Sequence, residues 1–96
     1  MAPKETDNEL QLLGLVRQGD SAAMKAVYSR YVRYLAAVCS RYILNSEDVK
    51  DVLQDSFLKI FSGIESFEYR GEGSLKAWLA KVTVNEILKF LRRDKL

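Results

Sequence analysis

Apolar residues recur along the chain at spacings of three and four with polar residues between them, which is the pattern of amphipathic helices. In the first helix that this pattern predicts, Asp7 or Asn8 is the N-cap and Gly19 marks the end. Its apolar positions are Leu10, Leu13 and Val16. Residues 1–7 are expected to form a loose N-terminal tail.

A second, longer helix is predicted from a cap at Asp20 or Ser21 to about Leu44. Its apolar positions are Met24, Val27, Tyr31, Leu35 and Val38. These positions form a single stripe, so one face of this helix is expected to be buried.

Asn45 and Ser46 interrupt the pattern, and Ser46 is the expected cap of a third helix that ends near Gly63. A loop over residues 64–73 follows, and Ser74 is the expected cap of a fourth helix that reaches almost to the C-terminus. No strand is indicated. The predicted fold is therefore a compact all-α bundle of about four helices.

The third predicted helix has two unlike faces. The core face holds Val49, Val52, Leu53, Ser56 and Ile60, with Phe57 and Phe61 toward its edge. The other face holds Asp48, Asp51, Gln54 and Asp55, with Leu58 among them. An apolar anchor ringed by acidic and amide groups is typical of an interface with a basic partner. The alternative is that Leu58 packs on the N-terminal helix and the acids are merely solvated.

The fourth predicted helix gathers polar residues on one narrow strip, with Trp78 at its upstream end. The strip consists of Lys81, Asn85, Lys89 and Arg92, beside an apolar face of Leu75, Leu79, Val82 and Phe90. A row of cations at helical spacing can neutralise successive phosphates, and an asparagine can reach base edges. Trp78 could stack on an unpaired base, but beside Leu75 and Leu79 it is expected to be at least partly buried.

The loop before this helix, residues 67–74, combines aromatic residues with Arg70, Gly71 and Gly73. Such a loop could close around a flipped-out nucleotide. It could equally be a helix connection whose aromatic residues cover the core, and the spacing does not decide between the two.

Charge divides the chain unevenly, although the net charge is only +2. Residues 74–96 hold six Lys or Arg against Glu86 and Asp94, whereas residues 45–73 hold three against seven acidic residues. This asymmetry indicates two different partners, one of them nucleic acid, or else a solvated surface whose charges happen to segregate.

Several classes of function are disfavoured by composition. Histidine is absent and Cys39 is the single cysteine, so neither an internal disulfide nor a zinc site is expected, and no other metal or cofactor is indicated. No nucleophile has a histidine base and no phosphate-cradling glycine motif occurs, so an enzyme is not expected. No signal segment or membrane-spanning run is present, and the expected location is the cytoplasm.

Four segments in order resemble domain 2 of the sigma-70 family of RNA polymerase sigma factors, in its extracytoplasmic-function (ECF) branch. They are Gly19-Asp20-Ser21-Ala22-Ala23 with Tyr28-Ser29-Arg30-Tyr31; Asp51-Val52-Leu53-Gln54-Asp55-Ser56-Phe57; Phe67 with Arg70-Gly71-Glu72-Gly73-Ser74-Leu75 and Trp78-Leu79; and Val84-Asn85 with Leu91-Arg92-Arg93. The resemblance covers residues 8–94, and the sigma region 2 domain is expected to occupy residues 8–96.

The resemblance implies a module that binds core RNA polymerase and recognises and melts the promoter −10 element, with no catalysis of its own. In the family, the face that matches Asp51, Gln54 and Asp55 binds the beta-prime clamp helices, with Asp55 replacing the commoner glutamate. Leu58 and Phe61 match apolar contact positions. The implied DNA-binding residues are Phe67, Arg70, Ser74, Lys76, Trp78, Lys81, Asn85, Lys89, Arg92 and Arg93.

ECF factors normally carry a second helical domain, region 4, which binds the −35 element, and we expect it to be absent from this chain of 96 residues. Promoter binding by this chain alone should then be weak. An anti-sigma factor is a further candidate partner, whereas a membrane or a small-molecule substrate is not expected. The alternative to the sigma-factor interpretation is a helical protein-interaction module without a DNA role.

Overall fold

Four helices account for most of the described chain, so the predicted all-α class is confirmed. The computed structural model describes the backbone of residues 5–94 and the side chains of residues 8–93. The helices are α1 (Glu5–Arg17), α2 (Ser21–Ser40), α3 (Ser46–Gly63) and α4 (Ser74–Asp94), and a 3-10 turn, η1 (Ile64–Ser66), follows α3. Within these residues there is no strand.

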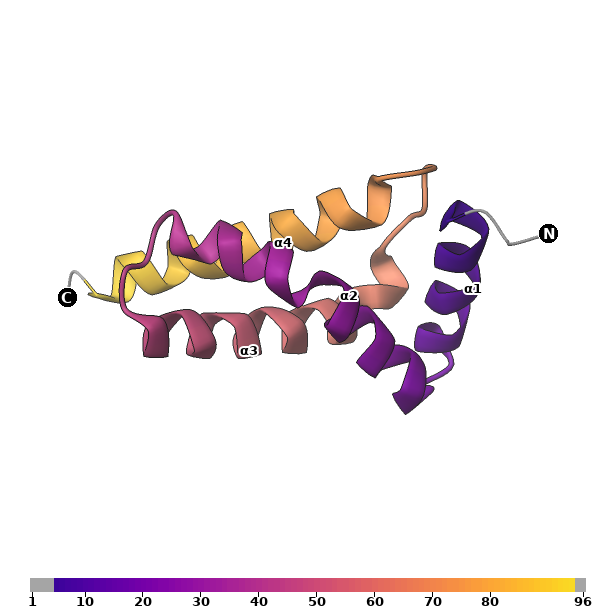
Figure 1. Ribbon diagram of the computed structural model, residues 1–96, viewed down its shortest axis with the longest axis horizontal. Helices are drawn as coiled ribbons and strands as arrows, with labels where there is room; N and C mark the ends of the chain where they lie inside the picture. The colour runs from indigo at the N-terminus through magenta and orange to yellow at the C-terminus, as the bar shows by residue number, and fades with distance from the viewer. Residues whose placement is uncertain (1–4, 95–96) are drawn as a thin grey trace.

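The three longer helices lie along the length of an elongated body of 51 × 23 × 23 Å (Figure 1). Each of α2, α3 and α4 packs against the other two. The shortest helix, α1, stands across one end of this bundle, where it contacts α2 and η1 (Figure 1). The loop that joins η1 to α4, residues 67–73, lies at the same end.

The core forms where the predicted apolar stripes meet. Leu35 of α2, Ile60 of α3 and Leu79 of α4 are each 0% exposed and belong to one cluster, which also takes in Leu13 and Val16 of α1. A smaller cluster at the other end holds Cys39, Ile43, Val52 and Ile87. All four helices contribute to the larger cluster, and Leu53 of α3 packs against both clusters.

Three buried polar side chains of the core take part in hydrogen bonds, one of them between helices and two within a helix. Glu9 of α1 is 5% exposed and accepts a hydrogen bond of 2.6 Å from the hydroxyl of Tyr31 in α2. Ser56 and Thr83 are fully buried, and each donates its hydroxyl to the carbonyl four residues earlier in its own helix. The Glu9–Tyr31 bond joins α1 to the bundle, and removing one partner by substitution would leave the other buried without its hydrogen bond.

Three predicted helix boundaries are wrong. The first helix begins at Glu5, so Asp7 and Asn8 lie inside it instead of capping it, and the expected tail over residues 1–7 does not hold beyond residue 4. Residues 1–4 lie outside the described chain. The second helix ends at Ser40 instead of about Leu44.

The third wrong boundary concerns the cap of α3. The side chain of Asn45, not that of Ser46, accepts hydrogen bonds from the amides of Glu47 and Asp48, at 2.9 and 3.1 Å. Asp20, by contrast, caps α2 as predicted and accepts from the amide of Ala22 at 3.0 Å. Helix ends differ by one or two residues from expectation where several capping residues stand side by side.

The two glycines near the end of α1 provide a matched test of the fold. Gly14 lies inside the helix and a Cβ there would meet nothing within 4 Å, so Gly14→Ala should stabilise the protein by about 0.5–1 kcal/mol through helix propensity. Gly19 has a φ of +84°, so Gly19→Ala should destabilise it by about 1–2 kcal/mol. Urea unfolding midpoints measure both, and effects of equal sign would contradict the assignment of α1.

Cys39 is 0% exposed, and burial raises the pKa of its thiol from the ordinary value of 9.0 to about 11. The raised pKa means that the protonated thiol stabilises the fold fully below about pH 9, and that this contribution is lost as the pH rises through about 11. Disulfide exchange with a chromogenic reagent at pH 8 should therefore be slow in the native protein and fast in urea. Equal rates would show that Cys39 is accessible.

Candidate nucleic-acid and protein interfaces

The acidic side of α3 faces solvent. Asp51, Gln54 and Asp55 are exposed, whereas Val52, Ser56 and Ile60 on the opposite side are buried. Leu58 lies on the exposed side and is 65% exposed. The alternative that Leu58 packs on α1 is therefore wrong, and the predicted combination of an apolar anchor with an acidic rim is present on the surface.

Phe61, the fifth residue expected on this surface, is half-buried and packs against the core cluster. The centroid of its ring lies 6.0 Å from the ring centroid of Phe57. The ring centroid of Phe57 lies 4.7 Å from that of Tyr28 in α2. These aromatic residues line an apolar groove between α2 and α3, with Leu53 and Leu58. Sequence analysis missed Tyr28 as a surface residue of this groove, because only the packing of α2 on α3 brings it there.

A second depression lies between α3 and the end of α4. It is lined by Asp51, Val52, Gln54, Asp55, Phe90 and Arg93. Arg93 therefore shares a depression with the carboxylates of α3. Arg93 was grouped with the DNA-binding residues, but its position near the acidic side of α3 separates it from the basic strip of α4.

The basic strip of α4, defined as Lys81, Asn85, Lys89 and Arg92, is exposed along its whole length. The opposite side of the helix is buried, through Leu75, Leu79, Thr83 and Ile87. The ammonium of Lys89 lies 3.9 Å from the carboxylate of Glu86, so the negative charge of Glu86 partly neutralises it. Lys81, Asn85 and Arg92 have no polar partner among the described contacts and face solvent.

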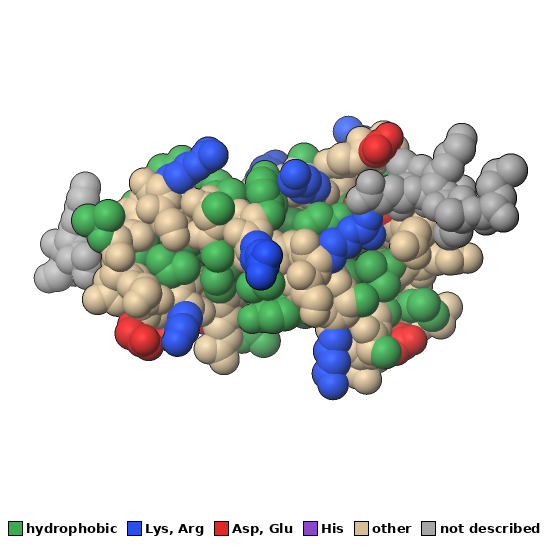
Figure 2. All heavy atoms as spheres, in the orientation of Figure 1, with side chains coloured by type: hydrophobic (Ala, Val, Ile, Leu, Met, Phe, Trp, Pro, Cys, Tyr) green, Lys and Arg blue, Asp and Glu red, His purple; other side chains and the backbone are tan. Residues whose placement is uncertain are grey.

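On the face of the molecule drawn in Figure 2, Lys and Arg side chains are spread along the length of the body. The acidic side chains visible there lie toward its two ends, and hydrophobic side chains are exposed between the cations (Figure 2). A surface of this kind offers cations to an anionic polymer together with apolar area that its bases can contact.

Trp78 is half-buried, as expected. Its ring lies 5.1 Å from the ring of Phe67, and a Cβ at Gly63 would lie 3.7 Å from it. One edge of the indole is therefore packed against the end of α3. The remainder is at the surface, at the upstream end of the basic strip.

Lys76 and Phe67, which were also predicted to bind DNA, lie apart from the strip. Lys76 is exposed, but its ammonium lies 4.4 Å from the ring centre of Tyr34. It lines a depression with Glu9, Arg30, Tyr31, Tyr34, Glu72 and Gly73. Phe67 is only 6% exposed and belongs to the core cluster, so its side chain is placed to support the loop and not to stack on a base.

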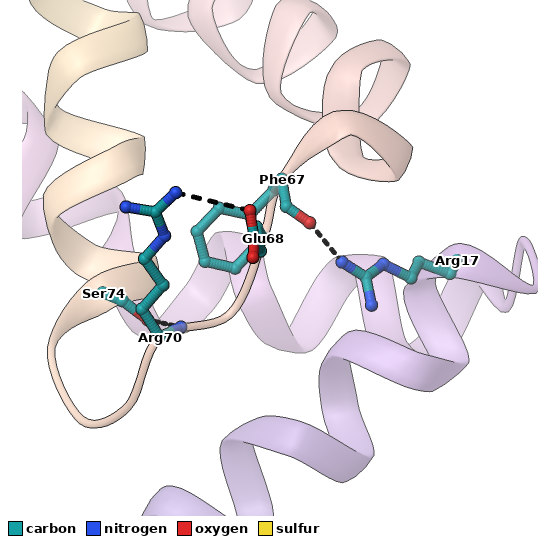
Figure 3. A network of polar contacts seen from close by, with 5 residues as sticks. All are labelled: Arg17, Phe67, Glu68, Arg70 and Ser74. Carbon is teal, nitrogen blue, oxygen red and sulfur yellow. Dashed lines mark hydrogen bonds and ion pairs between the residues drawn. The ribbon is translucent and has the colours of Figure 1, made fainter.

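Ser74 closes the loop instead of capping α4. Its hydroxyl accepts a hydrogen bond of 3.1 Å from the amide of Arg70 (Figure 3). It also donates one of 2.7 Å to the carbonyl of Gly71. Gly71 and Gly73 have φ angles of 109° and 86°, which this tight turn requires. Ser74 thus shapes the loop from within.

The exposed tip of the loop carries an ion pair. The guanidinium of Arg70 lies 3.3 Å from the carboxylate of Glu68, and both side chains are about three-quarters exposed (Figure 3). The sequence pattern indicates a role for Arg70 but none for Glu68. A charge at position 68, two residues before an arginine in a turn, is the signal that could have indicated it.

No group of His, Cys, Asp or Glu in the described part of the chain is arranged to hold a metal ion. None of the described helices combines the length and apolar character needed to cross a membrane. The candidate functional side chains are those of the α3 surface, the basic strip of α4 and the loop between η1 and α4.

Comparison with known proteins identifies the family. A family model described as Sigma-70 region 2 matches residues 27–96. The chain is 38% identical to the ECF RNA polymerase sigma-E factor of Haemophilus influenzae over 91 residues, which are 95% of this chain and 46% of that protein. It is 35% identical to the sigma-E factor of Escherichia coli K12 over 80 residues, which are 83% of this chain and 40% of that protein.

A solved structure has the same fold. It is the NMR structure of an engineered region 2 of sigmaE in complex with GTAAAA, with a TM-score of 0.81 and 30% identity over 99% of this chain and 95% of that one. The chain thus spans less than half the length of the curated relatives it matches and nearly the whole of this structural one. The chain belongs to the sigma-70 region 2 family, in its extracytoplasmic-function branch.

Proposed function

We propose that this chain docks on core RNA polymerase through α3 and holds unpaired DNA of the promoter −10 element on α4 and the preceding loop. The observation that carries the proposal is that the candidate contact residues on one side of α3 and of α4 are exposed, while the opposite side of each helix is buried. Asp51 and Leu58 on α3 and Lys81 and Asn85 on α4 are therefore available to partners.

The docking half of the proposal rests on chemistry at the α3 surface. Leu58 supplies an apolar anchor at 65% exposure, and the groove beside it extends the apolar area toward Tyr28. Asp51, Gln54 and Asp55 supply acceptors around it. A basic helical partner such as the beta-prime clamp helices fits this surface. An anti-sigma factor that covers the same residues would compete with polymerase.

The DNA half of the proposal needs no catalytic residue. Unpairing and unstacking a base costs on the order of a few kcal/mol, and stacking on an aromatic ring returns about 1–3 kcal/mol for each base. The exposed edge of Trp78 is the available aromatic surface, and the cations of α4 hold the phosphates beside it. The structural relative solved in complex with GTAAAA supports a short DNA segment as ligand.

In this proposal residues 8–96 form the sigma region 2 domain, and the bacterial cytoplasm, where RNA polymerase works, is its location. The competing function is a helical interaction module that uses only the Leu58 surface. Loss of function in Lys81→Ala and Arg92→Ala separates the two, because an interaction module without a DNA role would tolerate both changes.

Reversing one charge on α3 tests the docking surface. Asp51→Arg places a cation against a basic partner, so affinity for core RNA polymerase should fall at least about thirty-fold, the lower end of what losing a close charge pair costs. The measurement is a binding titration with purified core enzyme. Glu65→Arg is the matched control, since Glu65 is exposed but lies in η1, off this surface.

The thermal midpoint of both variants should remain near that of the unchanged chain, because both positions are exposed. Unchanged polymerase affinity in a folded Asp51→Arg variant would exclude α3 as the docking helix.

Two substitutions on α4 separate base reading from phosphate binding. Asn85→Ala should reduce the preference among single-stranded DNA sequences, whereas Lys81→Ala should weaken binding to all of them and reduce the salt slope by about one unit. Lys81 is a better phosphate probe than Lys89, which is partly balanced by Glu86. Fluorescence anisotropy at several salt concentrations distinguishes the two effects, and identical behaviour would remove Asn85 from a reading role.

A further inference from the structure

One hydrogen bond joins two parts of the chain that lie 50 residues apart. The guanidinium of Arg17, the last residue of α1, donates from Nη2 to the backbone carbonyl of Phe67 (Figure 3). Phe67 is the residue at which the chain leaves η1 and enters the loop that carries Arg70. The bond therefore acts on the backbone at the base of that loop.

We propose that Arg17 is a positioning residue for the DNA-reading loop, residues 67–73. The inference rests on the proposed function and names a residue outside the segments that resemble the family. In this role Arg17 contacts no DNA. It fixes the direction in which the backbone leaves the core at Phe67, and so the place to which Arg70 is delivered.

The loop is held at both ends, and between them Tyr69 packs against the core cluster. At its start the ring of Phe67 is buried and its carbonyl is bound by Arg17, while at its end the hydroxyl of Ser74 binds Arg70 and Gly71. Without Arg17 the start would keep its ring contact and the turn bond from the Phe67 amide to the carbonyl of Ile64, but its carbonyl would lose this partner. A loop that must be ordered on binding loses affinity and selectivity.

Helix α1 is a firm support for this bond. Leu13 and Val16 are each 2% exposed, and the buried Glu9–Tyr31 hydrogen bond ties the helix to α2. A basic side chain at a helix C-terminus is often explained by the helix dipole alone. Here the guanidinium reaches a carbonyl of another segment, which a dipole interaction does not require.

The experiment is selection from a pool of randomised single-stranded DNA hexamers, followed by sequencing, with this chain and three variants. R17A removes the donor, R17K keeps a charged donor, and R33A removes the same charge from an exposed position on α2. Amide hydrogen exchange of residues 67–73 is measured in parallel without DNA, and thermal midpoints check the fold.

We expect enrichment by R17A to fall about ten-fold, which is the loss that one charge-assisted hydrogen bond can produce. The fall should occur at those hexamer positions whose enrichment Asn85→Ala leaves unchanged. Exchange of the loop amides should rise in R17A and much less in R17K, which should also recover part of the enrichment. R33A should match the unchanged chain in both measurements.

Other outcomes overturn the inference. If R17A enriches the same hexamers as the unchanged chain, or loses affinity equally for all sequences with a smaller salt slope, Arg17 does not position the loop for reading. If loop exchange is unchanged in R17A, the same conclusion follows. If the unchanged chain itself enriches no sequence, the proposed function fails, and that result is distinct from a loss confined to R17A.

Discussion

The buried seam between α2, α3 and α4 is the constraint on which both candidate surfaces depend. Leu35, Ile60 and Leu79, one from each helix, are all 0% exposed. Because a helix repeats its direction every 3.6 residues, turning Ile60 and Leu79 inward necessarily turns Leu58 and Lys81 outward. Rotating either helix to hide these side chains would expose the core, so packing alone fixes where the charges stand.

This coupling explains why much of the site could be predicted from the sequence. The acidic side of α3 and the strip of α4 follow from periodicity, since the residues that define each lie on one helix. The same reasoning places Trp78 at the border between core and surface. It fails at helix ends, where Asn45 competes with Ser46 for the cap of α3 and Ser74 serves the loop instead of α4.

The remaining features depend on which elements meet, and periodicity within one helix does not contain that information. Tyr28 joins the α3 groove from α2, and Arg17 reaches Phe67 across 50 residues. Arg93 lies one residue beyond Arg92, yet the 100° step between neighbours carries it toward the carboxylates of α3. A helical plot shows that step, but only the packed structure shows what lies there.

The polar contacts that hold α1 and those at the tip of the loop differ in the free energy that breaking them costs, and this difference bears on the proposed role of the loop in reading DNA. Losing the partner of a buried group, as at Glu9 and Tyr31, costs about 1–3 kcal/mol. An exposed ion pair such as Glu68–Arg70 contributes about 0–1 kcal/mol. Arg70 can therefore exchange its carboxylate for a phosphate or a base edge at little cost while α1 stays in place. A helix α1 that is held by a costly contact supports the base of the loop through Arg17, while the weak pair at the tip leaves the side chain of Arg70 able to change partners.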